Sequence, residues 1–341
     1  MRPFRFRLAS DRAQALAAAD VPGERSAASH IGAPAQYLAG GTTLVDLMKL
    51  DVMRPEVLVD INALARQHGA IELAPDGLRL GALARMADVA DHPQVRRDYP
   101  VIAQSLELAA SPQLRNMASL GGNVLQRTRC NYFRDVSYEA CNKRNPGSGC
   151  AAMDGVNRRL AVLGVSDACI ANYPGDFAVA LAALGASVDV EGRAGRRVLA
   201  FEDLHRLPGA APHVETNLAP GELITGFSVP AGPWTRRSLY LKVRDRESYE
   251  FALASAAVAL DLDGGTVRDA RVGLGGVAAK PWRSAEAERV LRGRSFSEAV
   301  ARQAAEAAFA GAVAHEQTRF KIELGRRTLA RALAQCAAME A

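Results

Sequence analysis

The sequence predicts a two-domain α+β protein. A chain of 341 residues is long enough for two domains, each with its own core. Its first third alternates strand-like and helix-like segments, whereas beyond residue 232 strand patterns come first and helical patterns follow. Between these regions, Ala231-Gly232-Pro233 has the composition of a linker. We therefore expect one domain over residues 1–231 and a second over residues 232–341.

The first domain is expected to open with a βαβ unit. A strand at residues 36–39 is broken by Gly40-Gly41, a helix follows that Thr42 or Thr43 can cap with Asp46 as the capping-box partner, and a second strand covers residues 57–61. Later patterns predict strands at 78–82, 187–190 and 223–230, helices at 86–90, 100–110 and 176–186, and a loop-rich segment at 193–225.

The second domain is expected to contain a small sheet followed by helices. Apolar, strand-like runs cover residues 239–243, 252–262 and 270–277, and Asp263-Gly264-Gly265-Thr266 has the composition of a hairpin turn. Helical patterns then cover residues 297–315 and 320–338.

Charge and hydropathy exclude two broad classes of protein. The net charge of +5 comes almost entirely from scattered arginines, and no nucleic-acid recognition motif accompanies them, so no nucleic-acid partner is expected. No apolar run approaches the roughly 20 residues that span a bilayer, so direct membrane insertion is not expected. The N-terminus lacks a signal-peptide pattern, which leaves two compartments open: the cytoplasm, or the periplasm after export in complex with a partner.

Two glycine-rich segments suit a phosphate-bearing cofactor. Gly40-Gly41-Thr42-Thr43 precedes a predicted helix, and Ser119-Leu120-Gly121-Gly122-Asn123 pairs two glycines with flanking polar residues. Glycine lets the backbone approach an anion, and a helix N-terminus offers free N–H groups. Each segment alone is more often a plain turn, but together they can hold a pyrophosphate from two sides.

Four of the five cysteines lie in one arginine- and glycine-rich window: Cys130, Cys141, Cys150 and Cys169. Disulfides require an oxidising compartment, and a four-cysteine zinc site usually shows paired C-x₂₋₄-C knuckles, which are absent here. A [4Fe–4S] cluster tolerates wide spacing, and the nearby cations and glycines would offset its negative charge and donate to its sulfurs. Four unrelated buried cysteines remain the alternative.

Two further polar residues each fit two roles. Asp176, after Tyr173-Pro174-Gly175, fits an ordinary helix N-cap or an acceptor for a ribitol or ribose hydroxyl. Lys242 lies in an apolar strand and fits a solvent-facing residue or a contact to the edge of a flavin ring. Composition does not decide between these roles.

The two glycine segments, with their flanks at residues 39–44 and 114–123, resemble the FAD-binding medium subunit of molybdenum hydroxylases, the family of xanthine dehydrogenase, carbon monoxide dehydrogenase and aldehyde oxidoreductases. Residues 275–283 are similar to the C-terminal flavoprotein domain of that family. Most members have few residues where this chain inserts about 124–172. That insertion resembles the subset with an extra [4Fe–4S] cluster, and most of all the periplasmic aldehyde oxidoreductase type.

The resemblance implies a fold, cofactors and site residues. The fold would be a two-part FAD-binding domain of the vanillyl-alcohol-oxidase (PCMH) type, followed by a domain with a three-stranded sheet and helices. Asp176 would hold the sugar-like chain of the flavin, and Ile224 and Lys242 would lie beside its ring. Cys130, Cys141, Cys150 and Cys169 would hold the cluster. The implied contacts to the rest of FAD are Leu38, Ala39, Gly40, Gly41, Thr42, Thr43, Leu44, Val45, Ser111, Ser119, Leu120, Gly121, Gly122 and Asn123.

The function expected from the resemblance is electron transfer within a heteromeric enzyme. A large molybdenum subunit would oxidise the substrate, and a small [2Fe–2S] subunit would relay electrons to FAD on this chain and so to an external acceptor. No catalytic residue is expected here. Two other classes stay open: a stand-alone flavin oxidase, and a zinc-stabilised nucleotide-binding module without a redox role.

Overall fold

The structure is a computed structural model that describes residues 1–21 and 32–340. Its N-terminal part is a three-stranded parallel sheet in the order β1-β3-β2. The strands are β1 (Arg5–Leu8), β2 (Ala35–Leu38) and β3 (Val57–Asp60), flanked by α1 (Arg12–Ala19) and α2 (Leu44–Lys49). Strands β2 and β3 are parallel neighbours joined through α2, so the expected βαβ unit is confirmed.

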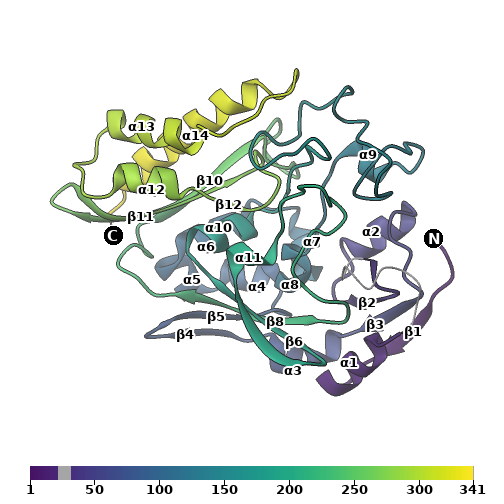
Figure 1. The fold of residues 1–341 in the computed structure, drawn as a ribbon. Coiled ribbons are helices and arrows are strands. Elements are labelled where there is room, and N and C mark those ends of the chain that lie inside the picture. The colour runs from purple at the N-terminus through teal and green to yellow at the C-terminus, as the bar shows by residue number, and fades with distance from the viewer. Residues whose placement is uncertain (22–31, 341) are drawn as a thin grey trace.

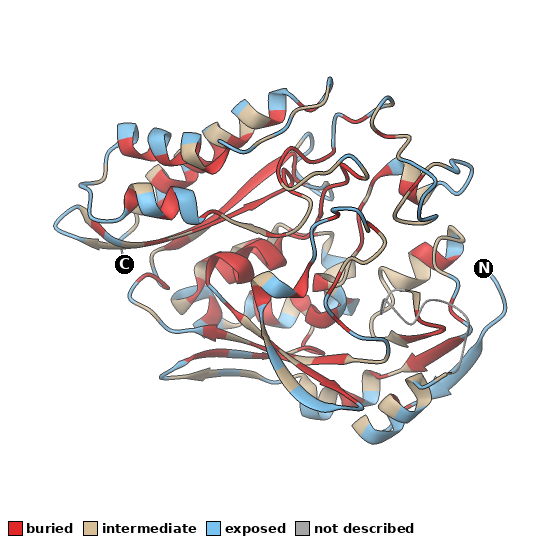
Figure 2. Ribbon diagram, in the orientation of Figure 1, coloured by how far each residue is buried: buried red, intermediate tan, exposed pale blue. Residues whose placement is uncertain are grey.

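A five-stranded antiparallel sheet in the order β4-β5-β8-β6-β7 forms the second part of this domain. The strands are β4 (Ile71–Ala74), β5 (Gly77–Gly81), β6 (Ser187–Gly192), β7 (Gly195–Ala200) and β8 (Leu223–Pro230). Helices α4 (Met86–Asp91), α5 (Pro93–Asp98), α6 (Pro100–Glu107) and α10 (Phe177–Ala183) supply its core. All seven residues of α10 are buried, which Figure 2 shows as a continuous red helix.

The prediction of a loop-rich segment at 193–225 is wrong at its start. Strand β7 and the short helix α11 (Phe201–Leu204) occupy residues 195–204. The sequence of β7 lacks the alternation of apolar and polar residues that marks a strand, because β7 is a mostly exposed edge strand and carries the charged Arg196 and Arg197.

The C-terminal part is a four-stranded antiparallel sheet in the order β12-β11-β10-β9, covered by helices. The three expected strands are β9 (Ser238–Val243), β10 (Ala254–Asp263) and β11 (Thr266–Gly275), and the two-residue β12 (Trp282–Arg283) joins their edge. Gly264 and Gly265 form the β10–β11 hairpin turn with φ of 54° and 82°, which favours glycine. The covering helices are α12 (Ala285–Leu291), α13 (Glu298–Ala308) and α14 (Phe320–Ala337), the outer layer in Figure 1.

Two glycines of β11 let the C-terminal sheet approach helix α10 of the N-terminal part closely. A Cβ atom added to Gly273 would lie 2.7 Å from the Val179 carbonyl oxygen, and one added to Gly275 would lie 2.6 Å from a Val179 methyl group. Both glycines belong to β11, and Val179 belongs to α10. The C-terminal sheet therefore packs directly on the buried helix α10 of the N-terminal part. In the described residues, no helix is long and apolar enough to cross a membrane.

The cysteine-bearing segment lies between α8 (Leu120–Val124) and α10 and is mostly irregular. It contains the one-turn helix α9 (Asn131–Arg134) and two isolated β-bridges, Cys141 with Cys150 and Ser166 with Cys169. Its far end is pinned to the C-terminal sheet, because Val162 and Leu163 both donate backbone hydrogen bonds to the Val277 carbonyl, at 2.8 and 3.0 Å.

Candidate functional site

The first glycine segment forms one wall of a pocket between the two sheets of the N-terminal domain. It connects the end of β2 to the start of α2, and Gly41 turns the chain with a φ of +73°. A Cβ on Gly40 would lie 1.9 Å from the Met117 carbonyl oxygen. Only glycine fits there, because the first segment packs directly against the residues that precede the second.

The second glycine segment forms the opposite wall, and it is helical rather than a loop. Ser119 caps α8, and its Oγ accepts a hydrogen bond from the Gly122 N–H at 3.3 Å. Gly121 lies against Ala82, where an added Cβ would be 3.2 Å from that residue. The sequence prediction of a glycine loop is corrected: serine capping and close packing make one helical turn despite the low helix propensity of glycine.

Most predicted FAD contacts line this pocket. Those that do are Leu38, Ala39, Gly40, Gly41, Thr42, Thr43, Leu44, Ser119, Gly121, Gly122 and Ile224. Val45, Leu120 and Asn123 belong to the same segments but are not among the lining residues. The sequence analysis missed Tyr37, Leu125, Arg127 and Glu222, which also line the pocket and carry no motif that singles them out.

The predicted capping box at the start of α2 is wrong. Thr43 occupies the N-cap position without a side-chain capping bond. Asp46 instead pairs with two arginines of the cysteine window, Arg134 at 2.7 Å and Arg129 at 3.4 Å. Burial opposes ionisation of Asp46, but the hydrogen bond and charge of Arg134, with Arg129 and Lys49, hold its pKa below the usual range. The helix that follows the first glycine segment is thereby tied to the cysteine window.

Asp176 and Lys242 form a buried ion pair away from these walls. Lys242 Nζ donates to Asp176 Oδ2 at 2.8 Å and to the Leu108 carbonyl at 2.9 Å, and its side chain is only 1% exposed. The solvent-facing interpretation of Lys242 is therefore wrong. Asp176 stands at the N-cap of α10 but makes no capping bond, because its other oxygen accepts from the Tyr240 hydroxyl at 2.7 Å.

Tyr240 extends this pair into a network, since its hydroxyl also lies 2.9 Å from Ser255 Oγ. Burial raises the pKa of Tyr240 well above its ordinary value, and the Asp176 carboxylate adds to the shift. Ser111 caps α7 (Pro112–Met117) by accepting from the Leu114 N–H at 3.4 Å. The described structure therefore gives Ser111, Asp176 and Lys242 structural partners of their own, and none of them lines the pocket.

The four cysteines of the window come together in space. Cys130, Cys141 and Cys169 are buried in one cluster with Cys150 packed against it, and all four are free thiols. Cys141 and Cys150 pair across a bridge, and Asn142 Nδ2 donates to the Ala168 carbonyl at 2.9 Å, which holds the Cys169 loop beside them. No disulfide joins these four cysteines in the described structure.

Burial and mutual proximity both disfavour thiolates at this cluster. Burial raises the pKa of Cys130 to about 12, with Cys141 and Cys169 adding to the shift. Burial also raises the pKa of Cys169 to about 11, although Lys143 opposes it. Four neighbouring thiols suit a metal-containing group, because binding such a group displaces the thiol protons. Among the described residues, however, no three His, Cys, Asp or Glu side chains are arranged to hold a metal ion.

Most of the arginines expected to balance a cluster have other partners. Arg127 pairs with Glu215, Arg129 and Arg134 with Asp46, and Arg158 and Arg159 with Asp245. The expectation for Gly147 and Gly149 is also corrected, because both donate their N–H groups to Asn142 Oδ1 at 3.1 and 3.0 Å. Cys169 Sγ does accept a backbone hydrogen bond, from the Ala171 N–H at 3.5 Å.

The pocket and the cysteine cluster are neighbours. Leu47, one turn into α2, is buried in the same apolar cluster as the cysteines, while Leu44 at the start of that helix lines the pocket. Arg127 lines the pocket and stacks on Phe133, 4.4 Å from its ring centre, and Phe133 is part of the cysteine cluster. Two prospective cofactor sites thus share one wall.

Comparison with known proteins identifies the family. Residues 10–232 match the FAD binding domain in molybdopterin dehydrogenase, and residues 239–341 match the CO dehydrogenase flavoprotein C-terminal domain. The chain belongs to this family of FAD-binding oxidoreductase subunits, and the resemblance and the fold class expected from the sequence are confirmed.

Individual relatives show which type of subunit within the family this chain resembles. The aldehyde oxidoreductase FAD-binding subunit PaoB of Escherichia coli (strain K12) is 44% identical, with 99% of each chain covered. The carbon monoxide dehydrogenase medium chain of Afipia carboxidovorans is 28% identical over 78% of this chain and 75% of its own. The solved carbon monoxide dehydrogenase from Hydrogenophaga pseudoflava has the same fold, with a TM-score of 0.74 at 24% identity, over 99% of this chain and 98% of that one. The chain is an FAD-binding medium subunit of the molybdenum hydroxylase type.

Proposed function

We propose that this chain is the electron-transfer subunit of a heteromeric aldehyde-oxidising molybdenum hydroxylase. A large molybdenum subunit oxidises the substrate, a small [2Fe–2S] subunit passes electrons on, and FAD on this chain delivers them to an external acceptor. The observation that carries the proposal is the 44% identity to an aldehyde oxidoreductase FAD-binding subunit over 99% of both chains. We further propose the division into residues 1–231 and 232–341.

FAD fits the pocket between the two glycine segments. Gly40, Gly41 and Gly122 line the pocket without side chains, and α2 and α8 begin at its two opposite walls, where their first turns offer free N–H groups. Arg127 supplies a cation at the edge of the pocket for a pyrophosphate. We propose that Asp176 and Lys242, as a buried pair, fix the strand and helix beside which the flavin ring lies. FAD itself supplies the redox chemistry.

A [4Fe–4S] cluster fits the four converging thiols. A single zinc ion needs its ligands about 2.3 Å from one point. An iron–sulfur cluster is a larger body and is held by four cysteine thiolates. Burial of the cysteines among apolar side chains favours a group that replaces the thiol protons. Cys130, Cys141, Cys150 and Cys169 are the proposed ligands.

Metal and acid-labile sulfide analysis tests this proposal. Anaerobically prepared protein is expected to contain about four irons and four sulfides per chain. Cys141→Ser should abolish the cluster absorbance. Cys336→Ser is the matched control, because Cys336 is also buried but lies in α14 with its thiol against the Arg237 carbonyl. Stoichiometric zinc without iron would overturn the cluster assignment.

A further inference from the structure

A small polar cavity lies at the C-terminal end of α8. Leu125 and Gln126, which follow that helix, form part of its lining, and Leu125 also lines the pocket between the two glycine segments. Tyr173, His205 and Thr216 line it as well. The volume of the cavity is about 30 Å³. A cavity needs about 10–15 Å³ to hold a water molecule, so this one has room for one or two.

His205 and Thr216 bring to this cavity two buried polar atoms that have no hydrogen-bond partner among the described residues, His205 Nδ1 and Thr216 Oγ1. The two residues are 7% and 6% exposed. They face each other across an isolated antiparallel β-bridge with backbone hydrogen bonds of 2.9 Å on either side, so their side chains project from the same face. An unpaired polar atom in a protein interior costs the free energy of its lost hydration. A ligand that both atoms share would remove both penalties.

The hydrogen bonds of His205 decide what kind of ligand fits. Its Nε2 lies 2.8 Å from the Val124 carbonyl, which can only accept, so Nε2 carries a proton. Burial lowers the pKa of His205 to about 4, so the imidazole is neutral at neutral pH and its Nδ1 is an acceptor. A ligand at Nδ1 must therefore donate a hydrogen bond, which excludes a simple anion. Lys143 and Arg206 line the cavity against one carboxylate, Glu215, which disfavours a cation.

We propose that this cavity binds a water molecule that bridges His205 Nδ1 and Thr216 Oγ1. The water donates to Nδ1, and the Thr216 hydroxyl, which can both donate and accept, bonds it on the other side. The bridge fixes the imidazole so that Nε2–H stays on the Val124 carbonyl, which also accepts from the Tyr173 hydroxyl at 2.9 Å. Val124 is the last residue of α8, so the water anchors the end of the helix that begins at the second glycine segment. The inference does not depend on the proposed function.

A crystal structure of the full chain, at a resolution that shows ordered water, tests the proposal directly. One peak within hydrogen-bond distance of both His205 Nδ1 and Thr216 Oγ1 is expected. Nitrogen NMR of the same protein should find the His205 proton on Nε2 at neutral pH. A map without a peak between the two atoms, a direct His205–Thr216 hydrogen bond in its place, or a proton on Nδ1 would each overturn the proposal.

Thr216→Val gives an independent test, because a bound and an unbound hydroxyl predict opposite signs. If a water bonds the hydroxyl, the variant loses that bond and should raise the equilibrium constant of unfolding about fivefold. If the hydroxyl has no ligand, the variant removes an unpaired polar atom and should lower that constant, which would reject the bridge. Thr328→Val is the matched control: Thr328 is 3% exposed, and its hydroxyl donates to the Leu324 carbonyl at 2.7 Å, so it shows the effect of losing a known bond. Urea unfolding measures both variants.

Discussion

Gly40 and Gly122 both border the FAD pocket, but they are glycines for different reasons. A Cβ on Gly40 would collide with the Met117 carbonyl at 1.9 Å, so any substitution there must displace the backbone. A Cβ on Gly122 meets only Ser119 Oγ, at 3.1 Å. Gly122 is therefore the position at which cofactor binding can be tested without breaking the fold.

Gly122→Val is expected to weaken FAD binding by tenfold or more, a loss of at least about 1.4 kcal/mol. The branched side chain would enter the space that a phosphate needs, while α8 keeps its serine cap. Fluorescence titration of the apoprotein with FAD measures the effect. Gly311→Ala is the control, because no atom lies within 4 Å of its added Cβ. Normal FAD affinity in Gly122→Val would contradict the pyrophosphate assignment.

Lys321 predicts a pH dependence of stability. Its ammonium is fully buried and donates to the carbonyls of Arg159, Leu160 and Gly276, at 3.1, 2.9 and 2.6 Å. Burial lowers the pKa of Lys321 to about 7 from 10.5, and Arg158 and Arg159 add to the shift. Above pH 7 the unfolded chain holds a proton that the folded chain releases, so this group makes folding more favourable as pH rises from about 7 towards 10.5.

Urea unfolding of wild type and Lys321→Met, from about pH 6 to pH 9, measures this contribution. The variant leaves three carbonyls without their donor and should cost about 1–3 kcal/mol at the acidic end of this range. Relative to the variant, the wild type should gain stability across the upper half of that range. A flat or falling difference would mean that the carbonyls keep the ammonium charged in the folded protein.

The sequence predicted the role of a residue where that role follows from its own backbone or from local composition. It did not predict roles that depend on a partner far away in the chain. The glycine pairs and the four cysteines carry their chemistry in their own composition and spacing. Lys242 could not be assigned, because its partner Asp176 lies 66 residues earlier. The window arginines looked free for the same reason: Arg134 finds Asp46 across 88 residues. Pairing of this kind is a property of the fold.

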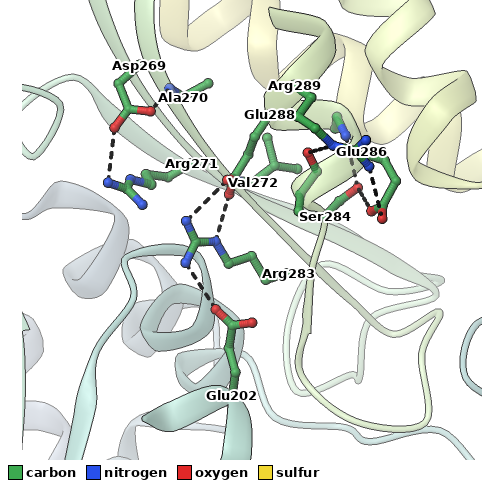
Figure 3. Close-up of polar contacts among 12 residues, drawn as sticks. Glu202, Asp269, Ala270, Arg271, Val272, Arg283, Ser284, Glu286, Glu288 and Arg289 are labelled. Atoms are coloured by element: carbon green, nitrogen blue, oxygen red, sulfur yellow. Dashed lines mark hydrogen bonds and ion pairs between the residues drawn. The ribbon is translucent and has the colours of Figure 1, made fainter. Parts of the chain in front are cut away.

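At the scale of elements, β12, α12 and α11 are joined by one polar cluster. Figure 3 shows Arg283 of β12 between Glu288 of α12 and Glu202 of α11. Glu288 is 2% exposed and accepts from Arg283 Nε at 2.8 Å, Arg292 Nη2 at 3.0 Å and the Val272 N–H at 3.1 Å. Arg283 then reaches Glu202 at 3.0 Å, which couples the C-terminal domain to the FAD-type domain.

Glu288→Gln is expected to destabilise the protein by about 3 kcal/mol, because it leaves the Arg283 cation in a buried setting without its main counter-charge. Glu202→Gln is the matched control: this carboxylate is 43% exposed, and its loss should cost less than about 1 kcal/mol. Thermal unfolding of both variants measures the difference. Equal effects would show that the contact between domains, and not the buried pair, carries the stability.

Elements were foreseen from the sequence where their apolar pattern is long, and missed where they are short or exposed. Strand β10 shows a run of buried alanine, valine and leucine, and α10 is apolar throughout, so both stood out. Strand β1 is exposed along its whole length, and β12 has two residues. Such elements exist because a neighbouring strand offers hydrogen bonds, which no local pattern reports.

At the scale of the whole molecule, we expect the chain to hold cofactors and its partner subunits to react with substrate. His205 lies behind the second glycine segment, with Nε2 2.8 Å from the Val124 carbonyl, and burial lowers its pKa to about 4. The His205 imidazole is therefore neutral near pH 7 and is enclosed by the protein. A direct oxidase needs a base within about 3 Å of a substrate proton. Glu222 is a carboxylate that lines the pocket, and it is held by an ion pair with Arg197 at 2.7 Å.

We therefore expect the isolated, FAD-loaded chain to leave aldehydes and N-heterocycles unoxidised, although dithionite reduces its flavin. Addition of the molybdenum and [2Fe–2S] subunits should restore substrate-dependent bleaching of the flavin, because substrate oxidation and electron entry occur on other chains. Anaerobic stopped-flow absorbance with and without the partners measures this directly. The same measurement on a complex that carries Cys141→Ser tests whether electrons need the cluster to reach the flavin. Rapid flavin reduction by a small aldehyde in the chain alone would make it a stand-alone oxidase, and the pocket between the glycine segments would then have to admit substrate as well as FAD.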